Sequence, residues 1–482
     1  MRIAIAGYGL EGKANLKYFR EKFLEAEFMI FDENATLADA PSGCELVLGN
    51  DAFAKIHDFD LVLRSAGIAP RKIGQKDKIW SATREFFANC PAPIIGVTGS
   101  KGKGTTCSFI YEILRAAGKT AHLVGNIGTP AIEKLPDVKS SDVVVYELSS
   151  FQLWDLEQSP HVAVMTLIEP DHLDVHANFA EYVDAKSHIF AYQKPGDVAV
   201  YNEADALVRE IAEKFAKQNS VVAKPFLNKK FVHIEQGKFY YNNEEICETS
   251  VVKLPGEHNL RNAAAAIDAV WEIIGGDRNA IANGLSNFRG LPHRLKFIRE
   301  VALGTSKDVQ GVKFYDDSIA TTPGSAIAAL NSFRESKVLI LGGHDKGADY
   351  REIGKIIAKL NREDRGTDDE PSVRAVIIFG ASRDKMANEI REVSDVEIRE
   401  IDTTAAEESF AKTKTNSPEN TDKLNDISRN VMAEIVQTAN ELSRPGDTVI
   451  LSPAASSFDL FNNYAERGDM FAAAVKSLGQ DV

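Results

Sequence analysis

The sequence of 482 residues has little cysteine and no long apolar run. Its longest apolar stretches, such as His161–Ile168, have strand length and fall well short of the roughly 18 residues that a membrane helix needs. The opening MRIAIAGYGL carries one basic residue before a short strand, which is not the pattern of a secretory signal. The cysteines form no Cys-x-x-Cys pair, which argues against a disulfide scaffold or a structural zinc site and favours reduced thiols. We therefore expect a cytoplasmic protein with no membrane partner. The four cysteines are Cys44, Cys90, Cys107 and Cys247.

Basic residues are outnumbered by acidic ones, 56 to 70, which gives a formal net charge of −14. A general nucleic-acid-binding role is disfavoured, because a local basic face would have to overcome this field. Hydrophobic residues make up 44% of the chain and charged residues 26%, so global disorder is excluded. At roughly 100–200 residues per domain, the length indicates about two to four domains.

Short β-rich runs alternate with stretches of helical spacing, which predicts an α/β protein with buried parallel strands. Proline-containing segments near residues 89–93 and 290–292 are candidate domain boundaries. A hairpin is expected within residues 231–246, with its turn at Gln236-Gly237. The polar segment Thr403–Asp426 is predicted to form a helix end and a loop. The main strand-like runs are IAIAG, EFMIFD, LVLRSAG, PIIGVTG, DVVVYEL, HVAVMTLI, DVAVYN, KVLILGG, RAVIIFG and DTVILSP, and the main helical stretches are Glu11–Leu24, Thr105–Ala117, Phe179–Tyr192, Ala204–Lys217 and Pro323–Arg334.

A glycine motif, Gly7-Tyr8-Gly9-Leu10-Glu11-Gly12, follows the first strand and opens a helix. Asp32 ends the next strand, 20 residues after Gly12. This spacing fits a loop that brings the backbone close to a diphosphate at a helix N-terminus. NAD and a UDP-sugar would both satisfy such a loop, and so would a tight turn with no ligand. The segment before residue 92 is too short for two complete mononucleotide-binding halves.

A second glycine-rich loop, from Gly99 to Thr106, follows the strand Ile94–Thr98 and precedes a helix. Successive backbone N–H groups in such a loop cradle phosphates, and Lys103 can reach the β- and γ-phosphates. The strict G-x-x-x-x-G-K-[ST] pattern is not met, because Val97 stands at the first glycine position and Gly104 follows the lysine. The first hydroxyl after the lysine is Thr105, to which we assign the Mg²⁺-facing role.

Three further residues fall at or near the same predicted sheet edge. Glu147 ends the strand VVVYE, and His172 follows the next strand, HVAVMTLI. Lys186 lies 14 residues further on in a helical stretch. A carboxylate at a strand end beside a phosphate loop can hold Mg²⁺, and open α/β sheets bind ligands at this edge. A lone histidine or lysine is more often structural, so it is their convergence that favours function.

Nine segments, in order along the chain, resemble the motifs of the Mur ligases, and with the glycine motif the resemblance spans from Gly7 to about Tyr464. They are TGSKGKGTT, GNIGTPAI, ELSSFQL, DHLDVH, LPGEHNLRN, LPHR, DDSIATTP, LGGHDKG and LSPAASSFDLF. The resemblance implies three domains: a Rossmann-like UDP-sugar domain at 1–92, a P-loop ATPase-type domain with a mostly parallel sheet at 93–290, and a Rossmann-like amino-acid domain at 291–482.

The resemblance also implies an activity, the ATP-dependent ligation of D-glutamate to UDP-N-acetylmuramoyl-L-alanine (UDP-MurNAc-L-Ala) in peptidoglycan precursor synthesis. ATP would phosphorylate the terminal carboxylate, and the amine of D-glutamate would attack the acyl phosphate. The enzyme would act as a monomer on small-molecule substrates. Its cofactors would be ATP and two Mg²⁺ ions, with Lys186 carbamylated.

Residue by residue, the resemblance assigns three binding sites, a metal site and a catalytic set. The UDP-sugar would contact Gly9, Leu10, Glu11, Asp32 or Glu33, Ser65, Gly67 and Asn126. ATP would contact Gly99, Ser100, Lys101, Gly102, Lys103, Gly104, Thr105, Asn259, Asn262, His293, Arg294, Asp317 and Thr321. D-glutamate would contact Lys346, Ser457 and Tyr464. The metal ligands would be Thr105, Glu147, His172 and carbamylated Lys186, and the catalytic residues Lys103, His172 and Lys186.

Two departures from the family pattern leave alternatives open. Gly104 replaces a hydroxyl residue and resembles the folylpolyglutamate synthase version of the loop, and Ile319 stands where D-glutamate ligases carry lysine. Another amino-acid-adding Mur ligase or a folylpolyglutamate synthase-like ligase is therefore the alternative activity. A nicotinamide dehydrogenase would leave Lys103 unused, and a non-catalytic nucleotide-binding module would leave the metal set idle.

Overall fold

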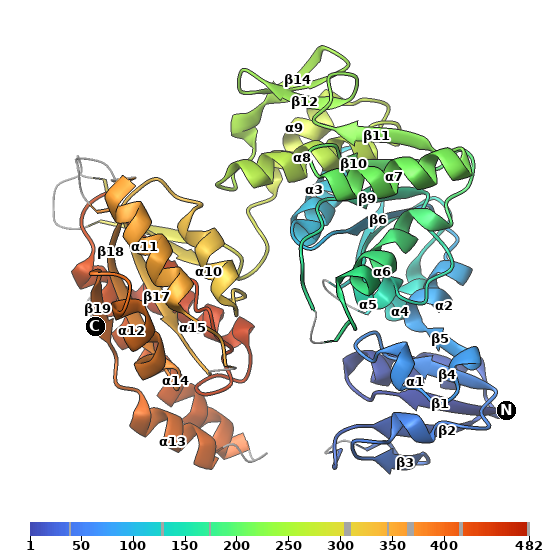
Figure 1. Cartoon of the computed structure of the whole chain (residues 1–482), viewed down its shortest axis with the longest axis horizontal. Coiled ribbons are helices and arrows are strands. Elements are labelled where there is room, and N and C mark those ends of the chain that lie inside the picture. The colour runs from blue at the N-terminus through green and yellow to red at the C-terminus, as the bar shows by residue number, and fades with distance from the viewer. Residues whose placement is uncertain are drawn as a thin grey trace. The chain divides into compact units, whose positions relative to one another are not determined.

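The computed structural model describes residues 1–37, 40–126, 130–172, 175–302, 310–344, 347–363, 371–413 and 418–479. They form two compact units, residues 1–253 with 257–288 and residues 254–256 with 289–482. The predicted α/β fold is confirmed, because parallel strands with helices on both faces recur in each unit (Figure 1). Among the described residues, no helix is both long and apolar enough to cross a membrane.

The first unit begins with a five-stranded parallel sheet in the order β3-β2-β1-β4-β5. Apart from Arg2 and Arg64, strands β1 and β4 are apolar, and most of their residues are buried, as expected for strands covered on both faces. The elements are β1 (Arg2–Ala6), α1 (Leu10–Lys22), β2 (Glu27–Asp32), β3 (Glu45–Leu48), η1 (Phe53–Lys55), β4 (Leu61–Arg64), η2 (Pro70–Lys72), η3 (Lys76–Lys78), β5 (Ile79–Ser81) and α2 (Ala82–Asn89).

A six-stranded parallel sheet follows, in the order β11-β10-β9-β6-β8-β7. Because all six strands run the same way, the ends of β6, β7, β8 and β9 lie along one edge. The elements are β6 (Ile94–Thr98), α3 (Lys103–Ala116), β7 (Ala121–Gly125), α4 (Ala131–Lys134), η4 (Leu135–Asp137), β8 (Val143–Glu147), α5 (Ser150–Leu153), β9 (Val162–Met165), α6 (Phe179–Ala191), β10 (Val198–Asn202), α7 (Ala206–Asn219) and β11 (Val222–Phe226).

The predicted hairpin is confirmed as part of a three-stranded antiparallel sheet. Gln236 and Gly237 both have positive φ, 48° and 76°, as a tight two-residue turn requires. A second such turn at Asn242-Asn243 adds a third strand. The unit closes with two helices on α3. The elements are β12 (Val232–Glu235), β13 (Lys238–Tyr241), β14 (Glu244–Glu248), η5 (Thr249–Val251), α8 (Glu257–Val270) and α9 (Arg278–Asn287).

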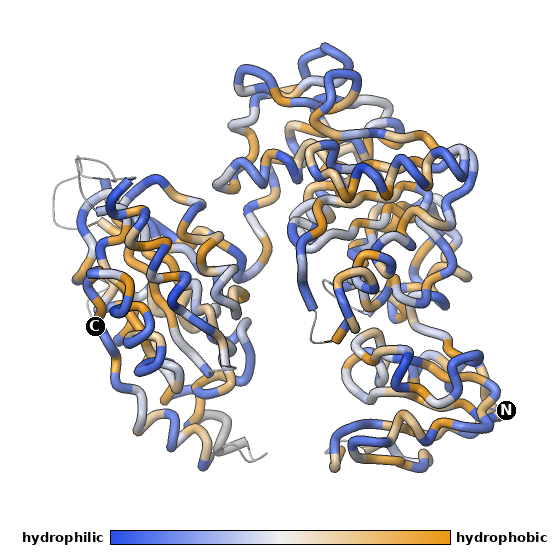
Figure 2. The backbone as a smooth tube through the Cα atoms, viewed as in Figure 1, coloured by the Kyte–Doolittle hydropathy of each residue, from blue (hydrophilic) through white to orange (hydrophobic). Residues whose placement is uncertain are grey.

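The second unit holds a six-stranded sheet in the order β15-β16-β20-β17-β18-β19, in which only β15 is antiparallel to its neighbour. Its inner strands are largely orange in the hydropathy view, whereas the helices show alternating colours because one face of each meets solvent (Figure 2). The elements are β15 (Lys296–Val301), β16 (Val312–Asp316), α10 (Pro323–Leu330), β17 (Lys337–Gly342), α11 (Arg351–Glu363), β18 (Val373–Phe379), α12 (Arg383–Arg391), β19 (Glu397–Glu400), α13 (Thr404–Thr413), α14 (Pro418–Leu442), β20 (Thr448–Leu451) and α15 (Tyr464–Ser477).

The prediction of a helix end and loop over Thr403–Asp426 is wrong where the structure describes this segment. Residues 404–413 form α13, and residues 418–426 are the first part of the 25-residue helix α14. Phe410, at 2% exposure, lies in the core although its neighbours are polar. Burial of Phe410 and packing of Ala406 on the core contribute to holding a short helix that composition alone disfavours.

Candidate active site

The loop between β6 and α3 passes so close to its neighbours that two positions accept only glycine. Gly99 has φ of +148°, and a Cβ there would lie 2.0 Å from Thr166 Oγ1. Gly102 has φ of +87°, and a Cβ there would lie 2.5 Å from Asn262 Oδ1. Thr166 in turn donates a hydrogen bond to the Lys101 carbonyl at 2.6 Å. The loop is therefore held in one shape from two sides, by β9 and by α8.

Two lysines meet at one carbonyl of this loop. Lys103 Nζ donates to the Gly99 carbonyl at 2.8 Å, and Lys186 Nζ donates to the same carbonyl at 2.9 Å. Lys186, on α6, is 1% exposed. Burial, and then the charge of Lys103, lower the pKa of Lys186 well below its usual value. The Lys186 amine therefore loses its proton more easily than an ordinary lysine does.

Glu147 ends β8 at the same edge and is 4% exposed. Its Oε1 accepts a hydrogen bond from Asn126 Nδ2 at 3.1 Å, whereas its Oε2 is buried with no hydrogen-bond partner among the described residues. The same holds for the hydroxyl of Thr106, one residue beyond Thr105. A buried oxygen without a partner is costly, and a hard cation such as Mg²⁺ takes such oxygens as ligands. The oxygens present fit a Mg²⁺ ion.

His172 lies after β9 with φ of +53° and a side chain 48% exposed. Its Nε2 is 3.5 Å from Asp171 Oδ2, and its ring packs against Phe151 at 4.9 Å between centroids. No hydrogen bond joins it to Glu147 or Lys186 within the described residues, and in that part of the chain no three His, Cys, Asp or Glu side chains form a metal-binding group. The predicted role of His172 at the metal stays a prediction.

The other predicted ATP contacts in this unit have different environments. Asn259 and Asn262 lie on α8 and are 7% and 8% exposed, Asn262 beside the loop. Ser100 donates its hydroxyl hydrogen bond to the Glu169 carbonyl at 2.8 Å and lies 2.7 Å from the Tyr182 hydroxyl. Lys101 is exposed and forms an ion pair with Glu169 at 2.8 Å. The loop is thus fastened to the segment that leads to His172.

The polar groups of the N-terminal glycine loop form hydrogen bonds within the protein. Tyr8 N–H donates to Asp32 Oδ2 at 2.7 Å, and Asn34 N–H donates to Asp32 Oδ1 at 2.9 Å. Ser65 donates its hydroxyl hydrogen bond to the Gly7 carbonyl at 2.8 Å. Both Asp32 oxygens therefore accept from the backbone, which assigns this aspartate a loop-shaping position.

Neighbouring residues of that loop differ in exposure. Glu11 Oε2 accepts a hydrogen bond from Ala66 N–H at 2.7 Å, and burial raises the pKa of Glu11. Leu10 is 72% exposed. Glu33 forms an exposed ion pair with Lys72 at 2.8 Å. Of the two acidic residues predicted for the uracil, Glu33 is thus the one whose carboxylate faces solvent. Gly9 and Gly67 each leave open space where a Cβ would be.

In the second unit, the residues after β16 form a buried polar group. His293 Nδ1 lies 2.7 Å from Asp316 Oδ2, and a Cβ at Gly468 would lie 2.1 Å from that nitrogen. Asp317 accepts hydrogen bonds from Leu295 N–H and from the Ser452 hydroxyl at 3.1 and 2.8 Å, and burial raises its pKa to about 7. Asp317 therefore changes charge close to neutral pH.

Other predicted residues of this unit are less enclosed. Arg294 is exposed, and Thr321 is half-buried before α10. Ser457 is 2% exposed in the loop after β20, whereas Tyr464 is 42% exposed at the start of α15. Lys346, predicted for D-glutamate, lies outside the described residues.

Arg467 was not predicted from the sequence. It is fully buried on α15 and donates to the Ser318 hydroxyl and carbonyl at 2.9 Å, the Gly342 carbonyl at 3.3 Å and the Ala455 carbonyl at 3.2 Å. Burial lowers its pKa to about 10. One side chain therefore joins the loops after β16, β17 and β20. The available sequence signal was an arginine directly before a glycine, in a stretch that otherwise has ordinary helical spacing.

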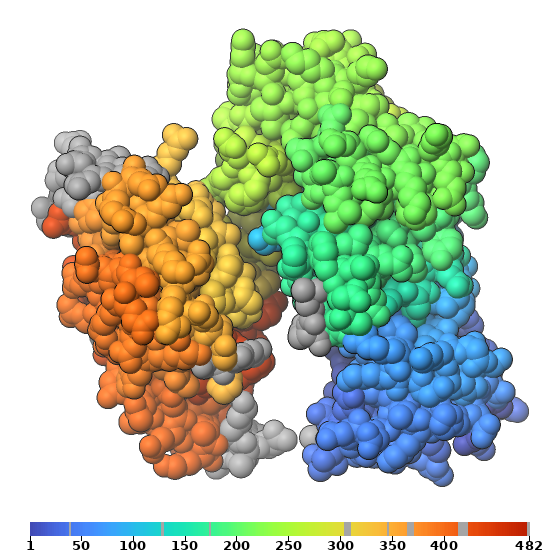
Figure 3. Space-filling model, viewed as in Figure 1, coloured from blue at the N-terminus to red at the C-terminus, as the bar shows by residue number. Residues whose placement is uncertain are grey.

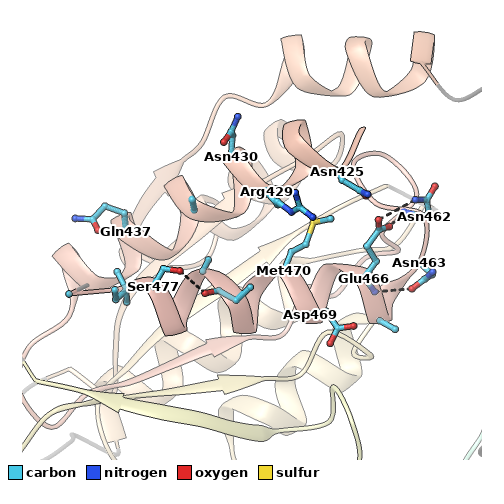
Figure 4. A pocket seen from close by; sticks show the side chains of 16 residues that line it. Asn425, Arg429, Asn430, Gln437, Asn462, Asn463, Glu466, Asp469, Met470 and Ser477 are labelled. Carbon is cyan, nitrogen blue, oxygen red and sulfur yellow. Dashed lines mark hydrogen bonds between the residues drawn. The ribbon is translucent and has the colours of Figure 1, made fainter. Parts of the chain in front are cut away.

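A groove of about 1060 Å³ also lies on this unit, between α14 and α15 (Figure 4). None of the predicted site residues that the structure describes lines it. Its labelled side chains are mostly amides and charged groups, among them Asn425, Arg429 and Glu466. The groove therefore contains none of the described residues that were predicted to bind ATP, the UDP-sugar, D-glutamate or a metal ion.

Comparisons with known proteins decide the family. Residues 97–270 match the Mur ligase middle domain. The chain is 33% identical over 504 aligned residues to the UDP-N-acetylmuramoylalanine–D-glutamate ligase of Acetivibrio thermocellus, covering 99% of this chain and 96% of that protein. The chain belongs to the Mur ligase family. A second Mur ligase of the same description, from Ruminiclostridium cellulolyticum, is 32% identical over 99% of this chain and 97% of its own length.

Solved Mur ligases share the fold at low identity. UDP-N-acetylmuramate–alanine ligase of Thermotoga maritima matches with a TM-score of 0.57 and 16% identity, covering 99% of each chain. The MurF ligase of Thermotoga maritima in complex with ADP matches with a TM-score of 0.53 and 16% identity, over 98% of this chain and 95% of that one. The α/β multidomain architecture is thus the architecture of Mur ligases.

Proposed function

We propose that this Mur ligase joins D-glutamate to UDP-MurNAc-L-Ala at the expense of ATP, in peptidoglycan precursor synthesis. The observation that supports it most is the sheet edge where Lys103 and Lys186 share the Gly99 carbonyl near a buried, half-partnered Glu147. This edge has the charges that phosphoryl transfer needs, and the near-full-length similarity to D-glutamate ligases supplies the substrates.

The chemistry has two steps. A carboxylate oxygen of the L-alanyl group attacks the γ-phosphorus of ATP, and ADP leaves. The amine of D-glutamate then attacks the acyl carbon, the tetrahedral intermediate expels phosphate, and the amine loses a proton. A carboxylate is a poor electrophile and an acyl phosphate is a good one, so positioning and charge neutralisation are the protein's contribution. We assign the γ-phosphate contact to Lys103.

Mg²⁺ would supply charge neutralisation of the phosphates, held by Glu147 and by Thr105 or its neighbour Thr106. We propose that Lys186 takes up CO₂ as a carbamate, which would give the site a second anionic oxygen ligand. A carbamate forms from a neutral amine, and the lowered pKa of Lys186 supports that state. His172 is proposed as a further ligand.

We propose the functional domains 1–92, 93–290 and 291–482 for the UDP-sugar, ATP and amino acid. The proposed D-glutamate contacts among the described residues are Ser457, in the loop after β20, and Tyr464. An α/β sheet presents its ligand crevice at such strand ends. The enzyme is proposed to act as a cytoplasmic monomer. Light scattering after gel filtration tests the oligomeric state.

A substrate panel tests the activity. Phosphate release is measured with ATP and UDP-MurNAc-L-Ala plus D-glutamate, L-glutamate, glycine, lysine or diaminopimelate, and with dihydrofolate plus L-glutamate. We expect release and a ligated product of the right mass with D-glutamate alone. Release with dihydrofolate, or with another amino acid in place of D-glutamate, would favour the folylpolyglutamate synthase-like or sister-ligase alternative.

A further inference from the structure

Arg64 is a fully buried arginine at the end of β4, in a strand that is otherwise apolar. Its Nε and Nη2 donate to the two carboxylate oxygens of Asp155 at 3.0 and 2.8 Å, a fork-to-fork pair. Nη2 also donates to the Phe151 carbonyl at 2.9 Å. Asp155 is itself only 12% exposed, so both charges are removed from water together.

The remaining donors of Arg64 turn back to its own loop. Nη1 donates to the Ala66 carbonyl at 2.8 Å and to the Ile68 carbonyl at 2.9 Å. The same loop is held on its other side, because Ala66 N–H donates to Glu11 and the Ser65 hydroxyl donates to Gly7. The guanidinium is thus the centre of a network that fixes the whole turn from Ser65 to Ile68.

The two ends of this network are functionally distinct. The turn after β4 includes Ser65 and Gly67, which we propose for the UDP-sugar. Phe151 is four residues beyond Glu147 and lies on α5, the short helix that leaves the sheet edge at which we propose the metal site. Both segments belong to the first compact unit, whose N-terminal and central parts form one continuous surface (Figure 3).

We infer that Arg64 is a positioning residue that sets the sugar-nucleotide turn against the α5 segment and so places the acceptor carboxylate relative to the γ-phosphate. This inference rests on the proposed function. A planar fork with five donors suits the role, since it fixes two backbone segments at defined angles, whereas an ammonium would act as one mobile point. Effective positioning is worth large rate factors, and an error of about 1 Å is costly.

The experiment compares Arg64→Lys and Asp155→Asn with Arg84→Lys in the full-length enzyme. Arg84 also pairs across the same two parts of the chain, with Glu157 at 2.8 Å, but Glu157 is 64% exposed and the pair touches no proposed ligand loop. It is therefore a matched control for a contact that merely joins these parts. Rates are normalised to the folded fraction from thermal melting.

We expect Arg64→Lys to lower kcat/KM for UDP-MurNAc-L-Ala by about ten- to a hundredfold, as loss of positioning does. The KM for ATP should stay within about twofold, because the phosphate loop is untouched. Asp155→Asn should show the same pattern more weakly, and Arg84→Lys should leave both KM values and kcat within about twofold. Activity that falls only with the folded fraction, with both KM values unchanged, overturns the inference in favour of a purely structural ion pair.

Arg64→Met/Asp155→Leu provides a second variant, since an apolar pair of similar volume can replace a buried ion pair without loss of stability. If this double variant folds and shows wild-type kinetics, the inference is also overturned; if it folds and keeps the selective loss in kcat/KM, the inference is supported. Wild-type enzyme that is inactive across the whole substrate panel would overturn the proposed function and this assignment together. An active wild type with unaltered Arg64→Lys kinetics overturns the assignment alone.

Discussion

The two glycine-rich loops of the first unit follow the same strand–loop–helix plan and differ in how their polar groups are used. Around Gly7, Asp32 and Ser65 bind the loop backbone directly. Around Gly99, two lysines share one carbonyl and a nearby Glu147 oxygen has no partner among the described residues. The first loop is held by hydrogen bonds within the protein, whereas the second has a buried carboxylate oxygen and two amines that suit a ligand bringing both negative charge and a cation.

Removing the charge of the second loop should have the largest effect. Lys103→Ala should lower kcat by at least about 10²-fold, the cost of deleting one preorganised contact to a developing charge. Steady-state phosphate release measures it. Lys134→Ala, which breaks only an exposed ion pair with Asp137, is the control and should behave as wild type. Near-wild-type turnover by Lys103→Ala would remove the lysine from the ATP site.

The Lys186 amine is the next point to test. Lys186→Ala should lower kcat by about 10²-fold, because the proposed carbamate and its anionic oxygen would be lost. Added acetate or another short carboxylic acid should restore part of the activity by occupying the vacated space. Lys186→Arg, which cannot form a carbamate and stays charged, should be inactive with or without acetate. A fully active alanine variant would contradict the carbamate proposal.

Equivalent glycines in the two loops should respond differently. Gly102→Ala forces a Cβ to 2.5 Å from Asn262 Oδ1 at a positive φ, whereas a Cβ at Gly9 meets no atom within 4 Å. The left-handed conformation alone costs about 1–2 kcal/mol, so Gly102→Ala should raise the KM for ATP about tenfold or more. Gly9→Ala should leave that KM unchanged. Titration calorimetry with a non-hydrolysable ATP analogue gives the same comparison without turnover.

The smallest effects are expected at the loop around Gly7. Asp32→Asn should mainly lower the melting temperature of the enzyme. The amide keeps one acceptor oxygen, so one of the two backbone N–H groups loses its acceptor, which costs about 1–3 kcal/mol of folding stability. Glu33→Gln should leave the melting temperature unchanged and raise the KM for UDP-MurNAc-L-Ala a few-fold. The reverse pattern would assign the uracil contact to Asp32 and the loop-shaping role to Glu33.

The sequence predicted most of what periodicity and glycine spacing control. Buried runs such as VVVYE and KVLILGG are strands, and helix α6, predicted as Phe179–Tyr192, ends one residue earlier. Short edge strands such as β3, β5 and β19 were missed, because three or four residues of mixed polarity carry no clear period. Their pairing depends on neighbours that a local pattern does not contain.

For the site, strand-end logic brought Glu147 and the phosphate loop to one edge, as the structure has them, whereas the contact of Asn126 with Glu147 was not predicted. The sequence did not predict the direction in which these side chains point. The shared carbonyl of Lys103 and Lys186, the backbone contacts of Asp32, and the buried guanidinia of Arg64 and Arg467 depend on packing between segments far apart in the chain. An arginine in a strand or helix gives no sign, by itself, of whether it ends in solvent or in the core.

Arg467 has a consequence for how the protein is made. Its guanidinium donates to carbonyls at or after the ends of three strands, yet it lies on α15, which follows all three strands in the chain. Until α15 has been synthesised and has docked, those carbonyls lack their donor and the loops lack their common anchor. Since domains fold in N-terminal order during synthesis, the phosphate loop can form early, whereas this edge of the second unit matures only after α15 has been added. A nascent chain truncated before Tyr464 should therefore bind nucleotide at the first unit while its second unit remains sensitive to protease.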